Sequence, residues 1–339
     1  MLHEDLLDTS PPDVLFWTSD RGGSLFSRCQ EPARALRLLS VRAEVTPVIT
    51  ESLRRARTIV GHRVVTDRQL EIWRRLAGDR LPGQKLVFDA DDDYWSVDET
   101  NSPHVHALYR DPGIRANLAE AVGLADLVTV CSARLAEVVR EHNPRVRVTP
   151  NTLPAELARP GGPVRRPGAP YVLGWAGSPG NHSGLNIVAE PVRRWLDRDR
   201  NATLHVIGLP GAAVAAKGLN HPRVRVTEWV SGTADYIRKI DFHVWLASYQ
   251  DTPFNAAKFP TKVMESSVLG IPVIASDISS YRSTFGPGVT LAGNDDESWY
   301  QAIRMVAPLD AWRRHQAAID GTRHLTECQA RTWQGVLTS

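Results

Sequence analysis

The stretch that decides the fold is Lys258-Phe-Pro-Thr-Lys-Val-Met-Glu-Ser-Ser-Val-Leu-Gly-Ile-Pro-Val-Ile-Ala-Ser276. It predicts a helix over 260–270, because proline is favoured in a first helical turn and glycine just beyond the last. The helix leads directly into an apolar run typical of a buried strand. Lys258 and Lys262 place positive charge at the helix start, where backbone N–H groups also attract phosphate, and Glu265 can accept hydrogen bonds from sugar hydroxyls. We therefore expect a helix–strand unit that binds a nucleotide.

Apolar runs of this kind recur along the chain, with helical spacing between them. In the first half the predicted strands are 14–17, 85–89, 127–131 and 146–149, and the predicted helices are 68–76, 114–124 and 132–142. In the second half the predicted strands are 171–176, 203–208, 224–228, 242–246 and 273–276, with helices at 185–196, 233–240 and beyond residue 295. Such alternation is typical of parallel sheets with helices on both faces, so we expect an α/β fold.

Prolines and glycines crowd into residues 153–170, which are not expected to form regular structure. This segment is the predicted linker between two domains that face one another across a cleft. We place the first domain at 1–160 and the second at 168–310, with helices over 311–339 that pack back on the first domain.

Composition excludes several classes of protein. The chain has 339 residues, enough for two α/β domains with separate cores. Its 40 basic and 38 acidic residues leave a formal net charge of +2, which gives no overall field for nucleic acid or membranes. Three widely spaced cysteines fit neither a disulfide framework nor a zinc site. No apolar run is long enough to span a membrane, so we expect a soluble, cytoplasmic protein.

A glycine-rich turn follows the first predicted strand of the second domain and contains Gly177, Ser178, Gly180 and Asn181. Glycines let the backbone approach a phosphate closely, and a helix N-terminus supplies N–H donors for it. We assign these four residues to donor binding. The spacing differs from the dinucleotide fingerprint, which disfavours a hydride-transfer enzyme. An ordinary tight turn between strand and helix would have the same composition.

A second turn of this kind follows the first strand of the first domain. It holds Gly22, Gly23 and Ser24, and Arg28 comes shortly after. This position predicts contact with an acceptor, or with the phosphate end of a donor across the cleft. The alternative is a flexible turn with a surface arginine.

Four carboxylates lie between Phe88 and Trp95, at the end of a strand where doubly wound sheets bind ligands. Neighbouring carboxylates raise one another's pKa, so Asp91 and Asp92 are candidates to exchange a proton or to orient a hydroxyl. Asp93 and Tyr94 are candidates for the acceptor side. Two alternatives remain: a magnesium or manganese site, and a solvated acidic loop or helix cap.

Residues 251–258 are predicted to form a loop in front of the helix at 260–270. Asn255 could hydrogen-bond a hexose or a diphosphate, and Lys258 could neutralise the charge of a departing diphosphate. Thr261 is added to the donor-binding residues, and Lys258 and Lys262 to the catalytic ones. The histidines are scattered without the pairing of a helical metal site, and we assign no metal ligands.

Two motifs together resemble a known family. Gly174-Trp-Ala-Gly-Ser-Pro-Gly180 and residues 262–276 resemble the C-terminal donor domain of GT-B glycosyltransferases of the group 1 type. Residues 128–136 and 148–154 resemble the end of such an enzyme's N-terminal domain. The resemblance implies two Rossmann-like domains, with a nucleotide sugar bound mainly by the second. It also implies a final helix that crosses back to the first domain.

The resemblance assigns roles to individual residues. Glu265 matches the second glutamate of the family's Glu-x7-Glu motif and is expected to hold the nucleotide ribose, while Gly270 and Pro272 match its structural Gly-x-Pro. The first glutamate falls at Ala257, so its sugar contact is missing or has moved to Asn255 or Asp251. The basic pair that many relatives carry after the Gly177 turn is absent, and Lys258 and Lys262 could supply that charge.

We therefore expect a glycosyltransferase of hexosyltransferase type. It would move a sugar from a nucleotide diphosphate sugar, taken as UDP-linked, to a hydroxyl of a saccharide, lipid or other small acceptor. The resemblance implies retention of anomeric configuration with no metal or other cofactor. One alternative is a DNA-modifying enzyme that acts on a hydroxylated base such as 5-hydroxymethylcytosine, with arginines over 54–57 and 63–75 on the phosphates. Another is a non-catalytic nucleotide-sugar-binding module. The sequence does not predict an oligomeric state.

Overall fold

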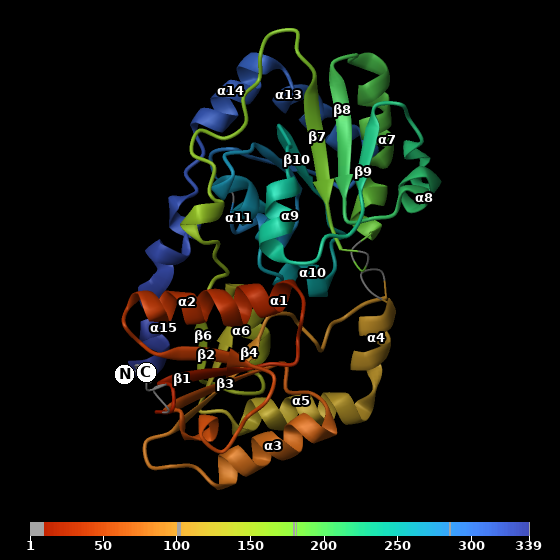
Figure 1. Cartoon of the computed structure of the whole chain (residues 1–339). Helices are drawn as coiled ribbons and strands as arrows, with labels where there is room; N and C mark the ends of the chain where they lie inside the picture. Colours follow the sequence, from red (N-terminus) through yellow and green to blue (C-terminus); the bar gives the residue numbers. More distant parts are fainter. Residues whose placement is uncertain (1–9, 100–102, 179, 181, 285, 339) are drawn as a thin grey trace, which may run out of the picture.

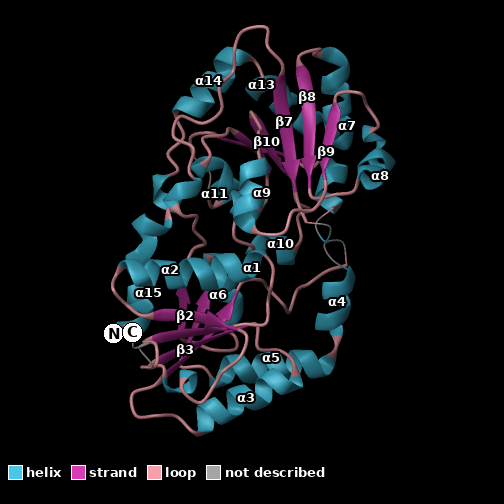
Figure 2. Cartoon of the chain, in the orientation of Figure 1, coloured by secondary structure: helices cyan, strands magenta, loops and turns pink. Residues whose placement is uncertain are grey.

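The computed structural model describes residues 10–99, 103–178, 180, 182–284 and 286–338 (Figure 1). Its strands form two separate parallel sheets (Figure 2). The first has the order β2-β1-β3-β4-β5-β6, with β1 (Val14–Trp17), β2 (Ala43–Thr46), β3 (Thr58–His62), β4 (Lys85–Ala90), β5 (Leu127–Val130) and β6 (Val146–Val148). The second has the order β12-β11-β10-β7-β8-β9, with β7 (Tyr171–Ala176), β8 (Ala202–Ile207), β9 (Val224–Thr227), β10 (Val244–Ala247), β11 (Val273–Ser276) and β12 (Val289–Ala292).

Helices cover the faces of both sheets, as parallel strands require. The first domain contains α1 (Gly23–Leu25), α2 (Glu31–Leu38), α3 (Asp67–Gly78), α4 (Pro103–Arg110), α5 (Pro112–Leu124) and α6 (Ala133–Val139). The later helices are α7 (Ser183–Arg198), α8 (Gly211–Val214), α9 (Thr233–Lys239), α10 (Pro253–Ala257), α11 (Thr261–Val268), α12 (Ser279–Arg282), α13 (Asp296–Val306), α14 (Leu309–Ala317) and α15 (Thr326–Thr338). The predicted α/β class with two Rossmann-like domains is confirmed.

Local sequence explains where several helices begin. Ser132 caps α6, because its hydroxyl accepts the Leu135 N–H at 3.1 Å. The predicted loop at 251–258 is wrong, since it contains α10. There Thr252 accepts the Asn255 N–H at 3.2 Å and Pro253 occupies the first turn, which together start a short helix.

The end of α11 shows why the sequence has glycine at residue 270. Gly270 has a left-handed φ of 64°, and a β-carbon there would lie 2.8 Å from the α-carbon of Gly162 in the linker. A side chain at this position would therefore clash with backbone. The structural role that the resemblance implied for Gly270 has this physical basis.

The chain crosses back to the first domain only in its last helix. Trp312 of α14 is buried in the core of the second domain, where its indole N–H donates to the His243 carbonyl at 2.6 Å. By contrast, Trp333 of α15 packs edge-on against Phe16 of β1, with ring centroids 5.3 Å apart. The expectation that all of 311–339 packs on the first domain is thus wrong for α14.

Helix α10 joins the two domains. Phe254 and Ala257 are buried in the same apolar cluster as Phe88 and Leu135 of the first domain. The Ser132 hydroxyl, at the start of α6, donates to the Ala257 carbonyl at 2.6 Å. The carboxyl end of β5 therefore faces the segment that leads into α11.

Candidate functional site

The sequence-predicted residues Asp92 and Lys258 meet between the two domains. Asp92 follows β4 of the first sheet, and Lys258 lies between α10 and α11 of the second domain. The Lys258 ammonium donates to Asp92 Oδ1 at 2.9 Å, and both side chains are about four-fifths buried, with 15% and 21% of their surface exposed. The Lys258 Nζ also lies 4.1 Å from the centroid of the Phe254 ring. An ion pair thus marks the contact between the domains.

Burial shapes the electrostatics of this pair. Burial raises the pKa of Asp92, and the Asp91 charge raises it further, while Lys258 opposes both. The predicted upward shift is confirmed for Asp92. Burial alone would lower the pKa of Lys258, but Asp92 and neighbouring groups raise it above its ordinary value. The lysine therefore stays charged and can meet a diphosphate.

Asp91 behaves differently from its neighbour. Burial would raise its pKa, but the Arg63 charge and the His62 ring, whose Nε2 lies 3.5 Å from Asp91 Oδ1, hold that pKa well below its usual range. Arg63 binds the carboxylate with Nε at 2.9 Å and with a second nitrogen at 2.5 Å. The prediction of an Asp91 carboxyl ready to exchange a proton is wrong, because a bidentate arginine stabilises its charged form.

Arg63 connects Asp91 to the glycine turn of the first domain. Its guanidinium donates to the Ser24 hydroxyl at 2.8 Å, while Gly22 and Gly23 are exposed at the start of α1. Arg63 has a left-handed φ of 55°, which is uncommon for a residue with a β-carbon and is associated with functional sites. The structure therefore brings Ser24 and Asp91 together through a residue that was proposed only as a DNA contact.

Three other predicted acceptor residues are structural, and those assignments are wrong. Arg28 is 1% exposed and binds Asp89 with two nitrogens, at 3.0 and 2.7 Å. Asp93 is 1% exposed and accepts the N–H groups of the two residues after Tyr94, each at 3.2 Å. Tyr94 is buried and stacks on Tyr109 with ring centroids 4.5 Å apart. All three are buried and pair with other residues of the first domain.

Lys262 and Glu265 form a second charged group at the start of α11. The Lys262 ammonium donates to Glu265 Oε2 at 3.2 Å and to the Tyr236 hydroxyl at 2.9 Å. The Tyr236 hydroxyl donates to the same carboxylate oxygen at 3.1 Å. Burial would lower the pKa of Lys262, but Glu265 and Tyr236 raise it. The expected trio of Lys258, Lys262 and Glu265 therefore lies along one short segment, with both lysines charged.

Tyr236 was missed by sequence reasoning. It lies in α9, and nothing in the local pattern of that helix distinguishes it from a surface tyrosine. Only the tertiary structure brings it to α11, 29 residues further along the chain. Its ring also lies below the Lys262 ammonium, with 4.9 Å between Nζ and the ring centroid.

The two residues predicted to contact the donor from α10 and α11 differ in their exposure to solvent. Asn255 is fully buried, and its amide N–H donates to the Gln250 carbonyl at 2.9 Å. In this arrangement the Asn255 amide N–H is engaged within its own loop, and its contact with a hexose or diphosphate stays a prediction. Thr261 is the first residue of α11 and is partly exposed. Ala257, at the position of the family's first glutamate, is buried against the first domain.

The glycine turn after β7 places backbone, and not side chains, at the carboxyl edge of the second sheet. Gly177, Ser178 and Gly180 are partly exposed there, while Asn181 lies outside the described residues. Gly208, after β8, has a φ of 103°, and a β-carbon on it would lie 2.0 Å from the Gly177 carbonyl oxygen. Glycine is therefore required where these two turns touch. In Figure 1 the arrows of β7 and β8 point from this sheet toward the first domain.

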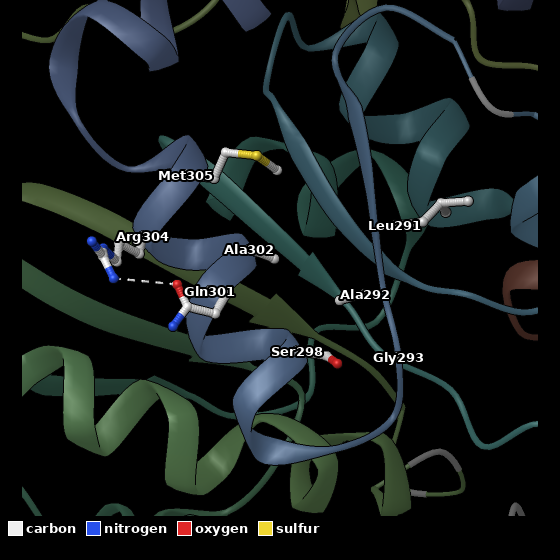
Figure 3. A pocket seen from close by; sticks show the side chains of 8 residues that line it. All are labelled: Leu291, Ala292, Gly293, Ser298, Gln301, Ala302, Arg304 and Met305. Atoms are coloured by element: carbon white, nitrogen blue, oxygen red, sulfur yellow. Dashed lines mark hydrogen bonds between the residues drawn. The ribbon is translucent and has the colours of Figure 1, made fainter.

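A surface pocket lies elsewhere, on the second domain. It has a volume of about 460 Å³ and is lined by residues of β12 and α13, including Ser298, Gln301 and Met305 (Figure 3). None of the predicted site residues lines it, so the charged groups at α11 remain the candidate site. Among the described residues, no three His, Cys, Asp or Glu side chains converge as metal ligands, and no helix is long and apolar enough to cross a membrane.

The second domain and the whole fold are each similar to known proteins. Residues 170–307 match the family Glycosyl transferases group 1. HepE from Anabaena, in complex with UDP and glucose, is similar in structure with a TM-score of 0.66 and 14% identity over 97% of this chain and 100% of that one. The chain has the GT-B fold, and its second domain matches the group 1 glycosyl transferases.

Other GT-B structures agree with this assignment. A glycosyltransferase from Rickettsia africae ESF-5 has a TM-score of 0.66 and 10% identity over 97% of this chain and 98% of that one. Sucrose-phosphate synthase from Thermosynechococcus elongatus has a TM-score of 0.61 and 14% identity over 96% of this chain and 95% of that one. No curated protein sequence matched the chain. At such identities the GT-B structures establish the fold, and the site must be argued from this chain's own residues.

Proposed function

We propose that the chain transfers a sugar from a nucleoside diphosphate sugar, taken as UDP-linked, to a hydroxyl of a small acceptor such as a saccharide or lipid. The observation that carries this proposal is the placement of Lys258, Lys262 and Glu265 at the start of α11, with Lys258 paired to Asp92 of the other domain. The family match over the second domain supports it. So does the presence of UDP in the similar HepE structures.

Each charged residue has a role in this proposal. Glu265 accepts hydrogen bonds from the ribose hydroxyls through the carboxylate that Tyr236 and Lys262 orient. Lys258 and Lys262, with the backbone at the Gly177 turn, bind the diphosphate and stabilise the charge that builds on it. Asp92 releases Lys258 to the diphosphate and orients the acceptor hydroxyl. Ser24 and Arg63 line the acceptor side.

The proposed reaction keeps the anomeric configuration. The acceptor oxygen forms a bond to the anomeric carbon on the face from which the diphosphate departs. The bond between that carbon and the diphosphate oxygen breaks, and the leaving group takes its electron pair. The hydroxyl proton passes to the departing diphosphate. Contact between the domains excludes the water that would otherwise hydrolyse the donor.

We propose that no metal is needed, because Lys258, once Asp92 releases it, brings a positive charge to the diphosphate beside Lys262. The three aspartates after β4 have separate partners: Arg63 for Asp91, Lys258 for Asp92 and backbone N–H groups for Asp93. Turnover that persists in excess EDTA would agree with this. Loss of turnover in EDTA, restored by magnesium or manganese, would contradict it.

The ion pairs of the arginines disfavour the alternative of a DNA-modifying enzyme. Arg63, Arg74 and Arg75 are each paired with a carboxylate, at 2.5 Å for Arg63 and Arg74, so they add little net positive charge to the surface. Binding of a duplex that weakens steeply with salt would favour this alternative.

Donor turnover by variants tests the proposed function. UDP release from a panel of UDP-sugars is measured for the wild type, Lys258→Ala and Glu265→Ala, with Lys239→Ala as control, since Lys239 is an exposed lysine of α9. Loss of one preorganised charge-stabilising group typically lowers kcat about 100- to 1,000-fold. We expect such losses for Lys258→Ala and Glu265→Ala and none for the control. Wild-type rates in both site variants would refute the assignment, and donor binding without any turnover would favour the non-catalytic module.

A further inference from the structure

Trp229 is an unusual surface residue in this chain. The structure describes all ten tryptophans of the sequence, and Trp229 alone is exposed, with 56% of its surface accessible. A large indole left in water loses the free energy that burial would give it. No packing role explains this exposure, and an exposed indole face can cover a flat ligand.

The position of Trp229 connects it to the donor site. It lies in the loop after β9, the edge strand next to β8. A β-carbon built on Gly208 would be 3.7 Å from Cε3 of the indole and 2.0 Å from the Gly177 carbonyl oxygen. The indole edge, Gly208 and Gly177 therefore meet at the carboxyl end of the sheet. The Gly208 N–H donates to the Thr227 carbonyl at 2.8 Å. This bond holds the turn after β8 against the end of β9, from which the Trp229 loop begins.

The same loop leads into the ribose site. Residues 228–232 connect β9 to α9, and Tyr236 of α9 contacts Glu265. A nucleotide whose diphosphate lies at the Gly177 turn and whose ribose lies at Glu265 has its base as the remaining flat, apolar group. Open glycine backbone beside an exposed indole provides a flat surface for such a group.

We propose that the indole of Trp229 is the surface on which the nucleobase of the donor stacks. This rests on the proposed function and adds a residue that determines affinity for the nucleoside part of the donor. A ring face contacts any base through its π-system and does not read hydrogen-bonding edges. Trp229 therefore contributes affinity for the base, and the choice among bases is made by other groups.

Nucleotide affinity of matched variants tests this inference. UDP, ADP and GDP are titrated into the full chain by calorimetry, and the tightest is used with Trp229→Ala, Trp229→Phe and Met305→Ala. Met305 is equally exposed at 56% but lies at the pocket of β12 and α13, so it controls for loss of surface apolar area. Base–aromatic stacking contributes about 1–3 kcal/mol and about 1.4 kcal/mol is tenfold, so Trp229→Ala should weaken binding roughly 5- to 150-fold. Trp229→Phe and Met305→Ala should stay within about threefold.

A ligand without a base separates stacking from a general defect. Inorganic pyrophosphate should displace the nucleotide with the same inhibition constant from the wild type and from Trp229→Ala. A matching loss for pyrophosphate, or unchanged nucleotide affinity in Trp229→Ala, would overturn this inference while leaving the proposed function in place. A wild type that binds none of the three nucleotides would overturn the proposed function, and this inference with it.

Discussion

Replacement of Arg28 by methionine tests the conclusion that this residue supports the fold and does not bind a ligand. Arg28 is 1% exposed and its partner Asp89 is fully buried. The guanidinium also donates to the Thr149 carbonyl and hydroxyl, at 2.5 and 2.8 Å, and to the Asn151 side chain at 3.0 Å. Arg28→Met keeps much of the side-chain volume but leaves the Asp89 carboxylate buried, with the Thr129 hydroxyl at 2.6 Å as its remaining side-chain donor.

The size of the effect follows from burial. Removing one partner of a buried ion pair costs about 3–5 kcal/mol, because the other charge is left without compensation. For a domain of this size about 1 kcal/mol lowers Tm by roughly 2–4 °C, so we expect a loss of about 6–20 °C. Urea unfolding and a thermal melt of the full chain measure it. The variant Arg28→Met/Asp89→Asn should recover part of the loss, because the amide carries no charge.

Two results would refute this reasoning. A free energy of unfolding for Arg28→Met within about 1 kcal/mol of wild type would show that Asp89 finds other compensation. A stable Arg28→Met protein with weakened donor or acceptor binding would restore the role in ligand binding that the sequence predicted.

Three further predictions concern charge, backbone and metal. The lowered pKa of Asp91 means that its charged form stabilises the fold above the ordinary carboxyl pKa and that this contribution is lost as pH falls through the lower pKa of the folded state. Asp91→Asn should therefore lower Tm at neutral pH and make Tm fall less steeply below about pH 4. A variant whose Tm falls as steeply with acid as that of the wild type would contradict this. Gly208→Ala should destabilise the chain by about 1–3 kcal/mol, since φ is 103° and the new methyl would meet the Gly177 carbonyl. Gly211→Ala, at an open position in α8, should be neutral, and equal effects at both sites would exclude the steric argument. Turnover in EDTA should equal turnover without it.

Much of the fold could be predicted because buried parallel strands are continuous apolar runs. Val14–Trp17, Tyr171–Ala176 and Val273–Ser276 have the predicted bounds, since both of their faces are covered. Strand β3 (Thr58–His62) was missed because Thr58, Gly61 and His62 interrupt its apolar run. It is nevertheless buried, since the His62 ring is hydrogen-bonded to Thr18 at 2.9 Å.

The candidate site was predicted where its residues are close in sequence and missed where they are not. Lys262 and Glu265 lie one helical turn apart, so their proximity is a local property. The partners of Arg28, by contrast, lie 61 to 123 residues away, and their arrangement follows from the order of strands in the sheet. A surface arginine and a buried one look alike in sequence. Only the structure shows that Arg28 faces Asp89 and that Arg63 binds Asp91 and Ser24.

In the proposed function, the start of α11 binds the diphosphate and ribose of a nucleotide sugar. The most direct measurement is calorimetric titration of UDP into the wild type, Lys262→Met, Glu265→Gln and the control Lys239→Ala. We expect the wild type and the control to bind UDP alike. Each site variant should bind it about tenfold more weakly or worse, since a hydrogen bond to a charged group contributes about 1.5–3 kcal/mol. Equal UDP affinity in all four proteins would contradict nucleotide binding at the start of α11.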